Sequence, residues 1–314
     1  MATVPTLGGE HFLTDAGLET CMVFKDGLDL PSFASFVLID GPGRPNLESY
    51  YRQCLTLAEQ HVTGFVLDTP SWRANPDWGE VLGLDRAQLE AVNRKGIAMV
   101  SDLRQQTAIA DKVPVNLVIG PRGDGYRPDG VMSVIEAAEY HTLQVGIGAD
   151  GGVDMVSAVT MNHLEEAQGI AAAAAKEGLS CVISFTVETD GKLPTGMTLA
   201  EAVKRTDDSN RGSVAYYMVN CAHPSHFLTA LDDDALRNRI GGIRANASRM
   251  SHAELDEAEE LDDGNPAELA CDYAEVLGAL PHVCVLGGCC GTDHRHVAAI
   301  VQECVPTIRS RKSA

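Results

Sequence analysis

Residues 155–185, which read MVSAVTMNHLEEAQGIAAAAAKEGLSCVISF, decide the fold class. Met155–Val159 and Cys181–Phe185 are short, largely apolar runs, typical of strands buried on both faces of a parallel sheet. Between them, Leu164–Glu177 has helical spacing and contains an alanine run, Ala171–Ala175, which strongly favours helix. The segment therefore predicts a strand–helix–strand unit.

The same alternation recurs along the whole chain. Further apolar runs that predict strands are Phe12–Leu13, Gly64–Leu67, Val115–Ile119, Tyr216–Val219, Gly242–Ala245 and Val283–Leu286. Helical spacing is found in Leu47–His61, Leu89–Ala110, Ser133–Gly146, Leu199–Thr206, Ala267–Gly278 and His296–Glu303. Eight strands alternating with helices predict an α/β protein, a (β/α)₈ TIM barrel in a single domain over residues 1–314. An open doubly wound sheet is the alternative, weakened because no G-x-G-x-x-G follows an early strand.

The composition of the chain limits the classes of molecule that it is expected to bind. The chain has 314 residues and a formal net charge of −20, which disfavours nucleic-acid binding because phosphate backbones are repelled. The charge is concentrated at Glu254–Asp263, inside an acidic loop or helix insertion around residues 251–268. Residues 1–12 lack a secretory signal, and no apolar run reaches the roughly 18 residues of a membrane span. We therefore expect a cytoplasmic protein with small-molecule partners and no membrane partner, and a homo-oligomer stays open.

A barrel places its catalytic groups at the carboxyl ends of its strands. The polar residues expected there are Asp15, Glu19, Asp68, Thr69, Arg122, Thr160, Glu188, Asn220, Cys221, Asn246, Cys289 and Cys290. Two strand ends carry cysteine: Cys221 follows Tyr216–Val219, and Cys289-Cys290 follow Val283–Leu286. These strands are two apart in a closed barrel, so the three thiols can converge.

Three converging thiolates are typical of a catalytic zinc site, because zinc prefers four ligands and the fourth position stays open. Neighbouring cysteines on a regular strand point to opposite faces, so Cys289 and Cys290 need a turn. Gly287, Gly288 and Gly291 provide that backbone freedom. The alternatives are buried core cysteines or a redox pair. Nine cysteines without a secretory signal do not predict a disulfide framework, and we expect core positions for Cys21, Cys54, Cys181, Cys271, Cys284 and Cys304.

The two cysteine motifs, Asn220-Cys221 and Gly287-Gly288-Cys289-Cys290-Gly291, resemble the signature of the zinc-dependent homocysteine S-methyltransferase family. The resemblance covers nearly the whole chain. It also includes the opening Thr14–Thr20, the stretch Asp68–Ala74 and the final Thr292–His296.

The resemblance implies a (β/α)₈ barrel with one zinc ion on Cys221, Cys289 and Cys290, acting in methionine biosynthesis. It implies homocysteine as the thiol acceptor, with Asp15 and Ala16 against its amino-acid part. A free thiol is mostly protonated at neutral pH, and zinc deprotonates it. The thiolate then attacks a methyl group on a small sulfonium or quaternary ammonium donor, since the chain has room for one barrel only.

Two positions depart from the family pattern. Glu19 replaces a glycine of the opening motif, and Val159 stands where the family keeps a carboxylate that holds the substrate ammonium. Glu19 or Glu188 could replace that carboxylate. Arg73 is a candidate clamp for a substrate carboxylate. The remaining candidates for substrate contact are Thr69 and Asn220.

Other functions remain open from the residues alone. A zinc hydrolase would place water in the open position, but hydrolases usually use His, Asp or Glu ligands. A non-enzymatic zinc- or redox-sensing barrel would instead need a closed site.

Overall fold

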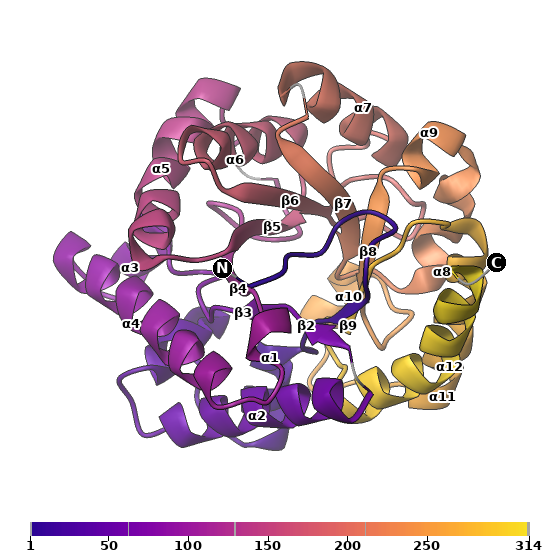
Figure 1. Cartoon of the computed structure of the whole chain (residues 1–314). Coiled ribbons are helices and arrows are strands. Elements are labelled where there is room, and N and C mark those ends of the chain that lie inside the picture. Colours follow the sequence, from indigo (N-terminus) through magenta and orange to yellow (C-terminus); the bar gives the residue numbers. More distant parts are fainter. Residues whose placement is uncertain (1, 62, 129, 211, 313–314) are drawn as a thin grey trace.

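The computed structural model describes residues 2–61, 63–128, 130–210 and 212–312, and they form one parallel barrel surrounded by helices (Figure 1). The strands are β1 (Phe12–Leu13), β2 (Gly64–Phe65), β3 (Leu67–Asp68), β4 (Val115–Ile119), β5 (Met155–Met161), β6 (Ser180–Phe185), β7 (Val214–Asn220), β8 (Ile240–Ala245) and β9 (Val285–Gly288). All neighbouring strands pair in parallel.

The ring closes through residues 64–68. β2 pairs with β1, in register Phe12↔Gly64, whereas β3 pairs with β4, in register Leu67↔Val115. Only Val66 separates β2 from β3, so the two segments occupy one position of the barrel. The nine strand segments thus fill eight positions, and the expected TIM barrel is confirmed.

Long helices form the outer layer (Figure 1). They are α2 (Arg44–His61), α4 (Arg86–Gln105), α5 (Val134–Gly151), α6 (Leu164–Lys176), α7 (Leu199–Asn210), α11 (Pro266–Ala279) and α12 (His294–Lys312). Shorter helices occupy the loops: α1 (Leu18–Thr20), α3 (Pro76–Val81), α8 (Pro224–Phe227), α9 (Asp234–Arg237) and α10 (His252–Asp256). No helix in the described ranges is both long and apolar enough to cross a lipid bilayer.

The last strand lies later in the chain than the apolar pattern predicts. The sequence predicts Val283–Leu286, whereas β9 runs from Val285 through Gly287 and Gly288, which pair with Arg244 and Ala245. A side chain at Gly287 would collide with Thr14 Oγ1, so glycine permits close approach of β1 here.

The core has two parts. Alternate strand residues such as Met155, Val182 and Met218 pack together inside the barrel, as the period of two requires. Their neighbours, among them Val156, Ile183 and Val219, pack outward against the helices. The polar side chains of the candidate site lie at the carboxyl ends of the strands.

The acidic insertion begins with a well-defined helix start. Ser251 caps α10 and exchanges hydrogen bonds with Glu254, which forms a capping box. Residues 257–264 then lead to Asn265, which caps α11. We refer to residues 251–265 as the acidic segment.

Candidate active site

A cavity of about 450 Å³ opens at the carboxyl ends of the strands. The candidate site residues that line it are Asp15, Ala16, Glu19, Thr69, Arg73, Asn220, Cys221, Cys289 and Cys290, with Val159 beside them. Glu188 does not line it, and neither do Arg122 and Asn246, which were also expected at the strand ends. The acidic segment contributes Leu255, Asp256, Ala258, Glu260, Leu261 and Asp262 to the mouth.

The three cysteines predicted as metal ligands come together. Cys221 follows β7, while Cys289 and Cys290 form the turn after β9, and the three Sγ atoms lie within 4.8 Å of one another. Among all described residues, this is the only group of three or more His, Cys, Asp or Glu side chains spaced to hold a metal ion. The backbone turns through positive φ at Cys221 (53°) and Gly291 (79°).

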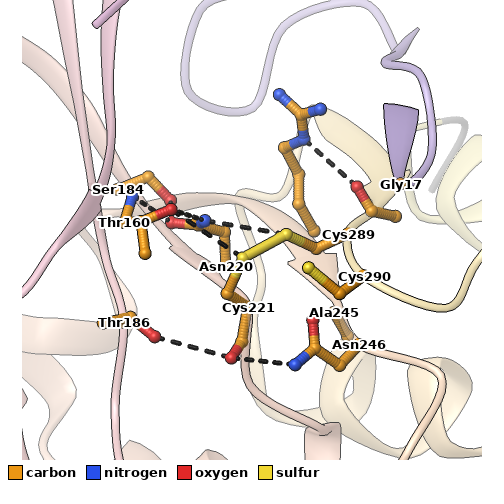
Figure 2. The surroundings of a disulfide bond; sticks show 12 residues. Gly17, Thr160, Ser184, Thr186, Asn220, Cys221, Ala245, Asn246, Cys289 and Cys290 are labelled. Atoms are coloured by element: carbon orange, nitrogen blue, oxygen red, sulfur yellow. Dashed lines mark hydrogen bonds between the residues drawn. A yellow bond between two sulfur atoms is a disulfide. The ribbon is translucent and has the colours of Figure 1, made fainter. Parts of the chain in front are cut away.

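The structure joins Cys221 to Cys289 in a disulfide, beside which Cys290 Sγ lies as a free thiol (Figure 2). This disulfide was not expected from the composition of the chain. The pairing has a local cause: two strand ends place these Cα atoms 5.4 Å apart, a usual separation for a disulfide. Cys271 is exposed and therefore not a core residue, whereas Cys21, Cys54, Cys181, Cys284 and Cys304 are buried as expected.

Asn220 lines the cavity and also supports the cluster. Its Oδ1 accepts from the Thr160 N–H (2.9 Å) and the Ser184 hydroxyl (2.6 Å), and its Nδ2 donates to Thr160 Oγ1 (2.9 Å). The same Nδ2 lies 4.0 Å from Cys289 Sγ (Figure 2). Thr160, near the end of β5, itself has a positive φ of 60°. The side-chain amide of Asn220 therefore connects the ends of β5 and β7, where the backbone turns.

Three buried charges form the floor of the cavity. The guanidinium of Arg244 on β8 makes ion pairs with Asp15, after β1, and with Asp68, on β3. Tyr50 Oη donates to Asp15 Oδ2 (3.3 Å) and accepts from the Ala16 N–H (2.9 Å). Burial raises the pKa of Asp15 to about 7, while Arg244 opposes that shift. Asp15 and Ala16 therefore already have partners within the protein.

Glu19 and Arg73 lie higher on the wall. Glu19 accepts from Ser35 Oγ (2.8 Å), and burial raises the pKa of Glu19. Arg73 stacks on Trp72 and Trp78, with 4.8 and 4.1 Å from Cζ to the ring centroids, and lies 3.6 Å from Asp124. Both face the cavity. Thr69 also lines the cavity, but its hydroxyl already has partners within the protein: Oγ1 contacts Ser71 Oγ at 2.6 Å and accepts from the Val118 N–H.

Glu188 lies behind the site. Its Oε1 is 3.3 Å from Nδ1 of His252, at the start of α10. The sequence could not show this contact, because it depends on how the loop after β6 meets the acidic segment.

Four residues of the site were missed by the sequence analysis: Arg244, Tyr51, Tyr126 and His252. Arg244 did carry a signal, since arginine inside an apolar strand is seldom buried without a partner. Tyr51 is fully buried, lines the cavity, and its hydroxyl has no hydrogen-bond partner among the described residues. Tyr126 Oη lies 3.8 Å from Cys290 Sγ.

Comparison with known proteins gives the chain its family. The family model described as homocysteine S-methyltransferase matches residues 57–304. No curated protein sequence is significantly similar to the chain.

The fold is similar to that of the homocysteine methyltransferase MmuM from Escherichia coli. Its metallated form aligns with a TM-score of 0.72 at 20% identity, covering 93% of this chain and 96% of that chain. For its oxidised form the TM-score is 0.73 at 21% identity, with 94% and 96% covered. These two likenesses show the shared fold, and the family model, which spans most of the sequence, shows that the chain belongs to the homocysteine S-methyltransferase family.

Proposed function

We propose that this protein transfers a methyl group from a small cationic donor to the thiol of homocysteine, with zinc held by Cys221, Cys289 and Cys290. The observation that carries the proposal is the convergence of three Sγ atoms within 4.8 Å inside the cavity of a family member. The acceptor sulfur gains the methyl carbon and loses its proton. The donor leaves as a neutral thioether or tertiary amine.

The three cysteine sulfur ligands fit a zinc ion. Three sulfur ligands leave one position of a tetrahedral zinc ion open, as in catalytic sites. Burial raises the pKa of Cys290 to about 11, so a bare thiol in this cavity keeps its proton near neutral pH. Bound zinc would supply the positive charge that stabilises thiolates here. Forming the set requires that the Cys221–Cys289 disulfide be reduced.

Charge in the cavity supports a cationic donor. Its lining contains seven carboxylates but only two guanidinium groups: Asp15, Glu19, Asp68, Asp124, Asp256, Glu260 and Asp262 against Arg73 and Arg244. Trp72, Phe33 and Tyr126 add aromatic surface, which attracts sulfonium and quaternary ammonium groups. Such a lining disfavours anionic donors.

For the acceptor, Glu19 is the best replacement for the carboxylate missing at Val159. Val159 lines the cavity and offers no charge, and Asp15 is paired with Arg244. Glu19 lines the same cavity, and burial raises its pKa although Arg73 and Arg244 act in the opposite direction. A substrate ammonium would add a further positive charge. We assign Arg73, which lines the same cavity, to the acceptor carboxylate.

The first test uses the reduced protein loaded with zinc. We expect about one zinc per chain, less in Cys221→Ala, and methyl transfer from S-methylmethionine, S-adenosylmethionine or glycine betaine to homocysteine. A chelator should abolish activity and preserve far-UV helicity, because the barrel has its own core. Full zinc retention in a folded Cys221→Ala variant would exclude Cys221, and no transfer from any of these donors would contradict the proposed function.

The acceptor contact is tested by Glu19→Gln. A hydrogen bond to a charged group contributes about 1.5–3 kcal/mol, so KM for homocysteine should rise roughly ten- to a hundredfold. The des-amino analogue 4-mercaptobutyrate serves as the internal control, and its KM should be unaffected. An equal effect on both thiols would exclude Glu19 as the ammonium partner.

A further inference from the structure

We infer that His252 is a positioning residue that joins the acidic segment to the sulfur cluster. It holds the backbone of Cys221 and fixes the ring of Tyr126 beside Cys290. The inference rests on the proposed function, because it assigns a role in metal binding and in donor binding at the same cluster.

The first contact holds the backbone of Cys221, a candidate zinc ligand whose backbone conformation is strained. His252 Nε2 lies 2.7 Å from the carbonyl oxygen of Cys221, and since a carbonyl only accepts, Nε2 donates. The same oxygen accepts from Asn246 Nδ2 (3.1 Å) and Thr186 Oγ1 (3.5 Å), as Figure 2 shows. Cys221 has a φ of 53°, which is unfavourable for a residue with a side chain and persists only where surrounding contacts enforce it. His252 makes the shortest of those contacts.

The second contact fixes the wall of the cavity. The imidazole of His252 stacks on Tyr126, with ring centroids 3.9 Å apart and an interplanar angle of 20°. Tyr126 lines the cavity, whereas His252 does not. The histidine therefore supports the tyrosine ring from behind, and the ring is held where its Oη lies 3.8 Å from Cys290 Sγ.

The third contact fixes the histidine itself. His252 is 5% exposed, and Glu188 Oε1 faces its Nδ1 at 3.3 Å. Ser251, the preceding residue, caps α10. One side chain thus connects the loop after β6, the start of the acidic segment and the turn after β7. Displacing His252 would disturb both the geometry of Cys221 as a zinc ligand and the part of the cavity wall that Tyr126 forms.

Two substitutions separate the two roles. His252→Gln keeps an N–H that can reach the Cys221 carbonyl but loses the ring, whereas His252→Phe keeps the ring and loses the donor. His226→Gln is the matched control, because His226 is also buried and donates to a backbone carbonyl, that of Arg249 (2.9 Å), yet none of its described contacts is with Cys221 or Tyr126.

The measurements are zinc affinity by chelator competition and KM values for S-methylmethionine and homocysteine. Removing a partner that orients a metal ligand costs about 10- to 100-fold in affinity, so His252→Phe should bind zinc at least tenfold more weakly. His252→Gln should keep zinc affinity and raise KM for S-methylmethionine several-fold more than KM for homocysteine. His226→Gln should change neither quantity.

A readout independent of catalysis is the rate at which iodoacetamide alkylates Cys290 in the reduced, metal-free protein, followed by peptide mass spectrometry. Loss of the ring that fixes Tyr126 should speed alkylation several-fold in His252→Gln but not in His226→Gln. This result would support the placement of His252 even if no methyl transfer were detected. Equal behaviour of all three variants in zinc affinity, KM and alkylation would overturn the inference.

Discussion

The floor and the mouth of the cavity both carry carboxylates, but the two regions use them differently. At the floor, Asp15 and Asp68 are 3% and 4% exposed, and both pair with Arg244. At the mouth, Asp256 and Glu260 are exposed, and Arg73 is the only basic residue of the cavity lining besides Arg244. Buried carboxylates require paired charge, whereas exposed ones act through the field that they create together.

The number of charged groups in the cavity therefore does not by itself identify a binding group. The floor acids already have partners within the protein, since both form ion pairs with Arg244. The mouth acids are available to attract cations. Three sets of substitutions test this contrast.

The largest effect is expected at the floor. Arg244→Met leaves two buried carboxylates without their cation, which typically costs about 3–5 kcal/mol in the free energy of unfolding. Urea denaturation at neutral pH should detect the loss. The triple variant with Asp15→Asn and Asp68→Asn added should recover much of it, because the uncompensated charges are removed. If Arg244→Met alone is as stable as the parent, the floor is not a tightly coupled ion group.

At the mouth, a moderate effect on binding without an effect on stability is expected. Asp256→Asn combined with Glu260→Gln should raise KM for S-methylmethionine about three- to tenfold at low salt, because the attractive field weakens. The difference should shrink in 1 M salt, where the Debye length is about 3 Å.

Glu257→Gln combined with Glu259→Gln is the matched control for the mouth. It removes the same number of charges from the same segment, but these residues do not line the cavity. A smaller change in KM is expected from it. Equal changes in the two double variants would mean that net charge matters and location does not.

The smallest effect concerns the link between the turn after β9 and the acidic segment at the mouth. Asp293, after the cysteine turn, pairs with Lys25 and Arg295, and both of these also reach Asp263 at the end of the acidic segment. Although burial opposes it, His296, Arg295 and Lys25 lower the pKa of Asp293. Its contribution to stability is therefore present above pH 3.8, the ordinary value, and is lost as pH falls below it.

Asp293→Asn should consequently destabilise the protein by about 1 kcal/mol at pH 7 and by less at pH 3. Thermal unfolding of parent and variant at both pH values gives the comparison. A difference that is equal or larger at pH 3 would contradict this assignment.

Much of the fold was predictable because buried parallel strands are continuous apolar runs, as at Val115–Ile119, which matches β4 residue for residue. The cysteine cluster was predictable because barrel topology brings strand ends together wherever the residues lie in the chain. The floor was not, since Arg244 meets partners 176 and 229 residues away in the sequence. Local patterns contain no information on such pairings. Glu188 shows the same limit, because its partner His252 is 64 residues away.

The floor group also constrains how this protein can change over evolutionary time. Substitution of Arg244 alone leaves two buried carboxylates without a cation, whereas substitution of Asp15 or Asp68 alone leaves one carboxylate paired with the guanidinium, so the effect of changing Arg244 should depend strongly on the other two positions. Double and triple replacements are then more accessible than their components suggest. An effort to redesign acceptor specificity would have to vary these positions jointly, in one combinatorial library, because single-site screens would discard every path that begins with the loss of Arg244.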